Sequence, residues 1–170
     1  GSRHSFNTIA DSDEDLVFMQ GLNRVIAIDP AARTVTVEAG ITYGELSPVL
    51  EAAGFALHNL ASLPHISVVG AVMTATHGSG NANGNLATQV VGLKLVTASG
   101  DTVSFVQGQP GFEGAVVSLG ALGIVTEVTL RIVPSFAVRQ NLYTNLPVQT
   151  LIDNFDAITS AAYSVSCFTP

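Results

Sequence analysis

Two hairpin patterns constrain the fold of this chain more than any other feature of its sequence. Residues 25–29 form a short apolar run, and a turn joins them to residues 34–39, where apolar and polar side chains alternate. Residues 90–98 and 102–106 form a second pair of this kind around a Ser-Gly-Asp turn. Strands joined by short turns run antiparallel, so the sheet cannot be wholly parallel. The sequence therefore predicts an α+β fold and not a doubly wound nucleotide-binding fold.

Helical patterns stand between the predicted strands. Thr42 precedes Glu45 by three residues, which is the spacing of a capping box, and Gly54 supplies a helix stop. By the same criteria we expect helices over residues 67–75, 111–119 and 148–162, and strands over residues 55–60, 124–133, 136–143 and 164–168. The pattern of predicted strands and helices changes after Pro134. We therefore predict one domain over residues 1–133 and the start of a second over residues 134–170.

The charge content narrows the classes of partner. Only 11% of the 170 residues are charged and 47% are hydrophobic, whereas an ordinary soluble domain has about a quarter of its residues charged. Such a chain is expected to bury surface against more chain, a large ligand or another subunit. Six basic and thirteen acidic residues give a net charge of −7, without a cluster of Lys and Arg. We expect no nucleic-acid partner, because binding to a phosphate backbone relies on such clusters.

The sequence also limits the location of the protein and the kinds of site it can hold. No run approaches the roughly 20 apolar residues of a membrane helix, and no secretory signal is present, so we expect a cytoplasmic protein without membrane contact. The single cysteine, Cys167, excludes an internal disulfide and is interpreted as a buried core thiol. The four histidines, His4, His58, His65 and His77, do not fall at metal-ligand spacings. We therefore expect no metal site.

Residues 62–80 are rich in small side chains and include two of the histidines. Glycine, alanine, serine and threonine let a ligand or another backbone come close. The segment suits a loop whose backbone N–H groups and hydroxyls surround a phosphorylated, planar cofactor, and it equally suits a packed helix followed by a flexible turn. The glycine-rich run over residues 78–84 matches neither a Walker loop nor a dinucleotide fingerprint, because it has no Lys-Ser/Thr and its third glycine comes one residue late.

Three motifs are more specific together than any of them alone. Gly-Ser-Arg-His-Ser-Phe-Asn occupies residues 1–7, Ser-Leu-Pro-His-Ile-Ser begins a segment over residues 62–78 that ends in Thr-Ala-Thr-His-Gly, and Gly-Ala-Leu-Gly-Ile-Val occupies residues 120–125. In this combination the chain resembles the vanillyl-alcohol-oxidase-type, or PCMH-type, FAD-binding domain. Within that family it is most similar to alditol (xylitol) oxidases and sugar-lactone oxidases. The resemblance implies that most of the family's N-terminal subdomain is missing here, and that residues 134–170 begin the substrate-binding domain.

The resemblance implies a role for each matching residue. His4 matches the histidine that is bonded covalently to the 8α-methyl carbon of the flavin. Ser62 matches a serine near both flavin and substrate, which is the catalytic position of this chain, and the substrate base lies outside the chain. Gly123 and Ile124 match a backbone contact to the cofactor. The other positions implied to bind FAD are Gly1, Ser2, Arg3 and Ser5 around His4, and Ser67, Gly70, Thr74, Ala75, Thr76, His77 and Gly78 along the small-residue segment.

The resemblance also implies an activity. The parent enzyme is expected to oxidise the terminal primary alcohol of alditols such as xylitol or sorbitol, with hydride transfer to flavin N5 and reduction of O2 to H2O2. The chain alone is expected to be inactive, and its partners would be the polyol, O2 and the rest of its own chain. Two alternatives stay open: an aldonolactone oxidase or dehydrogenase of the same family, and a non-catalytic flavin-binding module.

Overall fold

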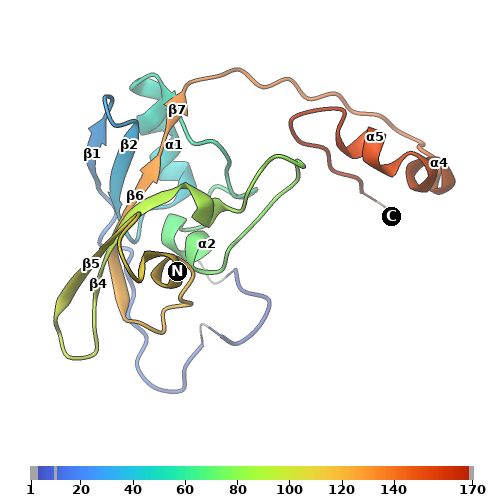
Figure 1. Cartoon of the computed structure of the whole chain (residues 1–170). Helices are drawn as coiled ribbons and strands as arrows, with labels where there is room; N and C mark the ends of the chain where they lie inside the picture. The colour runs from blue at the N-terminus through green and yellow to red at the C-terminus, as the bar shows by residue number, and fades with distance from the viewer. Residues whose placement is uncertain (1–3, 10, 169–170) are drawn as a thin grey trace.

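A five-stranded antiparallel sheet forms the body of the molecule (Figure 1). The computed structural model describes residues 4–9 and 11–168. The order across the sheet is β1-β2-β6-β4-β5, and every pair of neighbours is antiparallel. The strands are β1 (Val25–Asp29), β2 (Thr34–Glu38), β4 (Val90–Val96), β5 (Thr102–Val106) and β6 (Ile124–Arg131). Both predicted hairpins are present, as β1–β2 and β4–β5.

Short helices accompany this sheet; the first three of them pack against it and the last two lie apart from it (Figure 1). The helices are α1 (Tyr43–Ala52), α2 (Val68–Met73), α3 (Phe112–Val116), α4 (Val148–Asp153) and α5 (Phe155–Thr159), with a 3₁₀ turn, η1 (Leu86–Gln89), before β4. A separate two-stranded pair joins β3 (Phe55–Ala56) to β7 (Val133–Pro134). The predicted α+β fold is confirmed. Among the described residues, no helix combines the length and the apolar character needed to cross a membrane.

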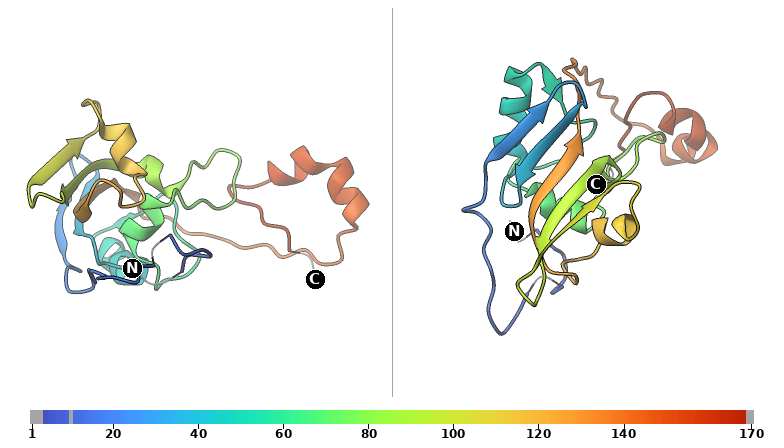
Figure 2. Two further views of the ribbon diagram at one scale, coloured as in Figure 1. Left: turned by 90° about the horizontal axis from the view of Figure 1, so that it is seen from below. Right: turned by 60° about the vertical axis from the view of Figure 1, so that its left-hand side comes forward.

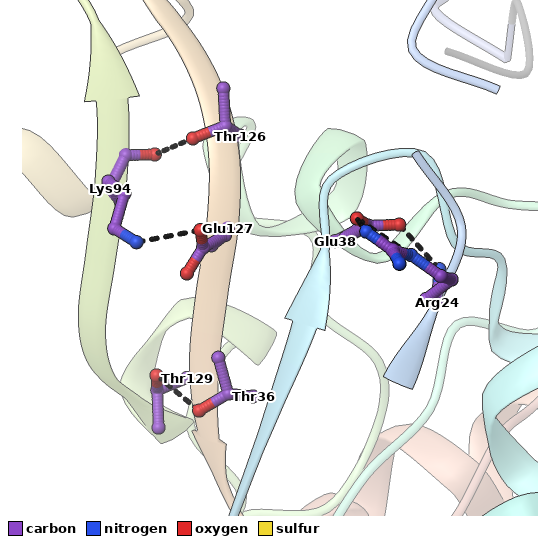
Figure 3. A network of polar contacts seen from close by, with 7 residues as sticks. All are labelled: Arg24, Thr36, Glu38, Lys94, Thr126, Glu127 and Thr129. Atoms are coloured by element: carbon purple, nitrogen blue, oxygen red, sulfur yellow. Dashed lines mark hydrogen bonds and ion pairs between the residues drawn. The ribbon is translucent and has the colours of Figure 1, made fainter. Parts of the chain in front are cut away.

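The core lies between one face of the sheet and the helices α1, α2 and α3 (Figure 2). Val35 and Val37 of β2 are completely buried, as are Leu46 of α1 and Val68 of α2. Side chains of a strand alternate between its two faces, so the residues between these valines lie on the opposite face. That face is polar: Thr36 hydrogen-bonds Thr129, and two ion pairs, Arg24–Glu38 and Lys94–Glu127, cross neighbouring segments (Figure 3).

The predicted start of α1 is confirmed. The Thr42 hydroxyl accepts a hydrogen bond from the Glu45 backbone N–H, and the Glu45 carboxylate accepts one from the Thr42 backbone N–H at 2.8 Å. Donation to the Glu45 carboxylate by the Thr42 backbone N–H, and also by the Thr42 hydroxyl, lowers the pKa of the Glu45 carboxyl, because it favours the charged form. The reciprocal bonds satisfy two N–H groups at the helix start.

The region after Pro134 differs from the sequence prediction. The predicted helix over residues 148–162 is two short helices that meet at Asn154, whose side chain donates to the Thr150 carbonyl. Residues 136–143 and 164–168 form no strand in the described part of the chain. A strand needs a neighbour for its backbone groups, and these segments run extended and largely exposed, away from the sheet.

Two smaller expectations are also corrected. The strand predicted over residues 55–60 is limited to Phe55–Ala56, because Leu57–Leu60 turn away after the two-residue pairing with β7. Cys167 is exposed and not a buried core thiol, because the C-terminal segment that carries it has no layer packed over it. The remaining predicted helices and strands are found with ends shifted by a few residues.

Polar contacts connect the C-terminal segment (residues 135–168) to the rest of the molecule. The loop over residues 78–84 reaches toward this segment (Figures 1 and 2). Asn81 donates to the hydroxyls of Thr159 and Ser160, and the Asn83 side chain donates to the Tyr163 carbonyl. No residue of α4 or α5 is buried. The C-terminal segment is therefore held by surface hydrogen bonds and contributes nothing to the core.

Candidate functional site

A pocket of about 400 Å³ lies where the start of α2, the end of β2 and the start of β6 come together. Four residues predicted from the sequence line it: Ser67, Gly70, Gly123 and Ile124. The segments that carry them are far apart in the sequence, so the fold brings them together. The outer wall of the pocket is formed by Val17, Met19 and Gln20, a stretch that the sequence analysis did not single out.

Backbone hydrogen bonds fix the position of Ser67 in the pocket. Ser67 pairs with Thr42 in an isolated antiparallel bridge. On either side of this bridge, the Tyr43 N–H donates to the Ile66 carbonyl at 3.0 Å and the Val68 N–H donates to the Ile41 carbonyl at 3.0 Å. The starts of α1 and α2 are therefore tied together, and the hydroxyl-bearing residues Thr42 and Ser67 both line the pocket.

Glycines leave backbone exposed along the pocket. Four of them line it: Gly40, Gly70, Gly120 and Gly123. Gly123 has φ +141°, and a Cβ there would lie 2.3 Å from the Val96 carbonyl oxygen. Such a position accepts glycine and strains any other residue. Beside it, Ile124 begins β6 with 42% of its surface exposed.

His4 lies beside this pocket. Its ring and that of His65 meet edge to face, with centroids 5.6 Å apart and an angle of 74° between the planes, and His65 lines the pocket. The Phe6 ring also lies edge to face with the His4 ring, with centroids 5.8 Å apart. The N-terminal histidine and the small-residue segment therefore meet in space, as their combination in the sequence predicts.

Other predicted residues lie away from this pocket. Residues 74–78 follow the end of α2, where the Thr74 hydroxyl donates to the Gly70 carbonyl and lies 3.1 Å from the Thr76 hydroxyl. Ala75 has φ +50°, and His77 and Gly78 are exposed. Ser62 lines a second pocket, of about 580 Å³, beside α1 and β3. Ser5 is exposed, and Gly1, Ser2 and Arg3 lie outside the described residues.

The residues that build the outer wall could not be predicted from the sequence. Gly40 follows β2, and a Cβ on it would lie 1.8 Å from the Met19 carbonyl oxygen, so the wall packs directly on its backbone. The pair Ala39-Gly40 at the end of an alternating strand is a signal of close backbone approach. Met19 and Gln20 carry no such signal, because they stand in an irregular segment without periodicity.

Comparison with known proteins identifies the class of domain. A family model described as "FAD binding domain" matches residues 1–106. The chain belongs to this family, the PCMH-type FAD-binding domains, and FAD is its cofactor.

The chain is similar to flavin-dependent oxidoreductases along most of its length. Alditol oxidase from Streptomyces sp. is 51% identical over 168 residues, which cover 98% of this chain and 40% of that protein. L-gulono-1,4-lactone dehydrogenase from Mycobacterium tuberculosis is 40% identical over 157 residues, which cover 91% of this chain and 36% of that protein. A solved structure of alkyldihydroxyacetonephosphate synthase matches with a TM-score of 0.61 at 26% identity, covering 69% and 22%. The chain spans two fifths or less of the length of these relatives.

The residues of the pocket fit FAD. A planar ring system needs flat apolar walls and close backbone approach, and the pocket offers Val69, Met73 and Ile124 together with its four glycines. Thr42 and Ser67 place hydroxyls among them. Among the described residues, no group of three or more His, Cys, Asp and Glu side chains is placed to hold a metal ion. The apolar side chains, exposed backbone and two hydroxyl-bearing residues of the pocket suit an organic ligand with polar edges.

Proposed function

We propose that this chain is the FAD-binding part of an oxidase that converts the terminal primary alcohol of an alditol, such as xylitol or sorbitol, to the aldehyde. In this proposal O2 is the final electron acceptor and H2O2 the second product. The observation that carries the flavin chemistry is the contact of the His4 ring with His65 at a pocket lined by Ser67, Gly70, Gly123 and Ile124. The alditol substrate is supported by 51% identity to alditol oxidase.

In the proposed site the protein binds and orients, and the cofactor carries the redox chemistry. FAD supplies an acceptor for the hydride of the alcohol carbon. His4 would anchor the cofactor covalently, since an imidazole nitrogen is a nucleophile and this ring lies at the pocket edge. The new C–N bond would replace an N–H bond of the imidazole and a C–H bond of the flavin methyl group, and O2 would accept the two electrons and two protons released. The Ser67 hydroxyl would donate to a polar edge of the ligand, and the apolar side chains of Val69 and Met73 would exclude water from it. The Thr42 hydroxyl could only accept, because it donates its proton to the Glu45 carboxylate.

A panel of substrates tests the proposed reaction. The full-length protein should produce peroxide with xylitol under oxygen, and more slowly or not at all with L-gulono-1,4-lactone. Turnover of the lactone alone would favour the second candidate, a lactone oxidase or dehydrogenase, which the 40% identity to L-gulono-1,4-lactone dehydrogenase supports. Replacing oxygen by a dye acceptor separates an oxidase from a dehydrogenase. Flavin binding without turnover of either substrate would leave a non-catalytic flavin module.

The covalent anchor has its own test. His4→Ala in the full-length protein should abolish the flavin that remains attached after acid precipitation. His58→Ala is the matched control, because His58 lies beside Tyr163 and lines neither pocket. Acid-stable flavin in the His4 variant would place the link at another residue.

We also propose that the FAD-binding domain ends near Pro134. Two observations support this boundary: β7 ends there, and the residues that follow run exposed and without regular structure up to α4. Residues 134–170 would then open the substrate-binding domain.

A further inference from the structure

The outer wall of the FAD pocket receives little support from the core. Residues 11–24 have no helix or strand, and all but Met19 are exposed. Val17 and Phe18 have 62% and 58% of their surface exposed. Since burial stabilises this stretch so little, specific contacts must hold it against the pocket.

Two points of attachment join this wall to the end of β2. The Gly40 N–H donates to the Leu22 carbonyl at 2.7 Å, and the Leu22 N–H donates to the Met19 carbonyl at 2.9 Å. The absent side chain of Gly40 makes room for Met19, whose carbonyl oxygen would lie 1.8 Å from a Cβ. The wall thus lies directly on the backbone that ends β2.

The second point of attachment is an ion pair. The Glu38 carboxylate accepts three hydrogen bonds from Arg24: the backbone N–H at 2.8 Å, Nε at 3.1 Å and Nη2 at 2.7 Å. Glu38 is only 5% exposed, although the Arg24 side chain is 80% exposed. The exposed Arg24 guanidinium therefore donates to a buried carboxylate, and this arrangement favours one fixed geometry of the pair.

A second glutamate on the neighbouring strand increases the need of the Glu38 carboxylate for a basic partner. Glu127 of β6 lies directly opposite Glu38 in the sheet, and like charges in that arrangement repel. Lys94 of β4 pairs with Glu127 at 2.7 Å, as Arg24 pairs with Glu38 (Figure 3). The four charges form one row across the sheet, and only the Arg24 end of this row belongs to the chain segment that continues into the wall.

We propose that the Arg24–Glu38 pair and Gly40 are positioning residues that hold the wall over residues 17–20 against the pocket, and so set how tightly the protein retains FAD. The inference rests on FAD lying in this pocket. It assigns the row of charges two different functions: the Arg24–Glu38 half supports cofactor binding, and the Lys94–Glu127 half stabilises the sheet alone.

The two halves of the row supply the test and its control. In the full-length protein carrying His4→Ala, which removes the proposed covalent link, FAD binding is titrated by quenching of flavin fluorescence. Glu38→Gln should raise the dissociation constant by about tenfold, because hydrogen bonds to a charged acceptor are lost. Glu127→Gln should change it by less than about twofold, because neither Glu127 nor its partner Lys94 lines the pocket. Arg24→Gln is a second variant. The Arg24 side chain is 80% exposed, so we expect this variant to fold normally.

A second readout separates positioning from general loss of stability. Hydrogen exchange of the peptide over residues 17–24 should accelerate in Glu38→Gln and Arg24→Gln, and Arg24→Lys should restore part of the protection. It should stay at the parent rate in Glu127→Gln. Equal weakening of FAD binding by Glu38→Gln and Glu127→Gln, or no weakening by either Glu38→Gln or Arg24→Gln, would overturn the proposal.

One further variant tests the pocket itself. Ile124→Trp places a large ring at an exposed position that lines the pocket, and it should abolish FAD binding. If Ile124→Trp binds FAD as the parent does, the cofactor lies elsewhere and the pocket assignment fails together with the inference. If Ile124→Trp abolishes binding while the Arg24 and Glu38 variants bind normally, only the inference about the wall is wrong.

Discussion

At the scale of single residues, the backbone conformation of Gly123 and its close neighbour exclude a side chain. Gly123 turns the chain into β6 with φ +141°, and its Cα lies against the Val96 carbonyl of the neighbouring strand. Gly123→Ala should lower the free energy of unfolding by about 2 kcal/mol or more, since backbone strain and a backbone clash act together. Chemical denaturation measures this. Gly114→Ala is the control: nothing lies within 4 Å of its Cβ position in α3, so stability should be unchanged or rise.

Glu38 should make stability depend on pH. Hydrogen bonds from Arg24 hold the pKa of the Glu38 carboxyl below its ordinary value of 4.5. The unfolded chain binds that proton first as the pH falls, so the stabilisation is complete above about 4.5 and is lost as the pH falls through the lower, folded value. Arg24, Glu127 and Lys94 are the charged groups in its row.

The comparison of Glu38→Gln with the parent measures this effect. The variant should be less stable at neutral pH, and the difference in free energy of unfolding should shrink as the pH is lowered below about 4.5. A difference that stays constant down to acid pH would show that Glu38 acts through its shape and not through its charge.

At the scale of elements, the start of α1 depends on one hydroxyl. Thr42 closes the capping box with Glu45, and the same residue pairs with Ser67 beside the pocket. Thr42→Ala should cost about 1 kcal/mol of unfolding free energy, because a helix N–H loses its acceptor. Thr42→Ser keeps the hydroxyl and should recover most of the loss in thermal or chemical unfolding. A loss that serine fails to recover would assign the effect to the methyl group of Thr42.

Elements with local signals could be predicted, and elements that depend on distant contacts could not. The hairpin β1–β2 and helix α1 carry their own turn and cap residues, so the sequence located them closely. Residues 136–143 have the alternation of a strand but find no partner in the described structure. The same division holds for the site: His4 and Ser67 belong to recognisable motifs, whereas the wall at Met19 is placed by Gly40 and Arg24, through contacts that no local pattern records.

At the scale of the whole molecule, the low charge content agrees with the uneven burial. The sheet and α1 to α3 share one core, whereas large apolar side chains stay exposed after Pro134, among them Val138, Leu142, Tyr143 and Phe168. The proposed FAD pocket lies within the body formed by the sheet, and no residue of the C-terminal segment lines it. The proposed cofactor pocket and the C-terminal segment therefore share no residue.

Limited proteolysis should reveal this separation. Residues 136–147 are exposed and have no regular structure, so opening them to a protease costs little free energy. In the 170-residue chain, chymotrypsin should cut at Leu142 or Tyr143, which are 82% and 84% exposed, as early as at the fully exposed Phe6 and before any site within the sheet or its helices. Tyr43 is the internal control, because it is 4% exposed within α1 and can be cut only after the body unfolds. Mass spectrometry of the first fragments shows whether cleavage occurs in residues 136–147 or at Tyr43. A first cut at Tyr43, or at Phe105 in β5, would mean that the body opens before the segment after Pro134, and the proposed domain boundary would have to be moved.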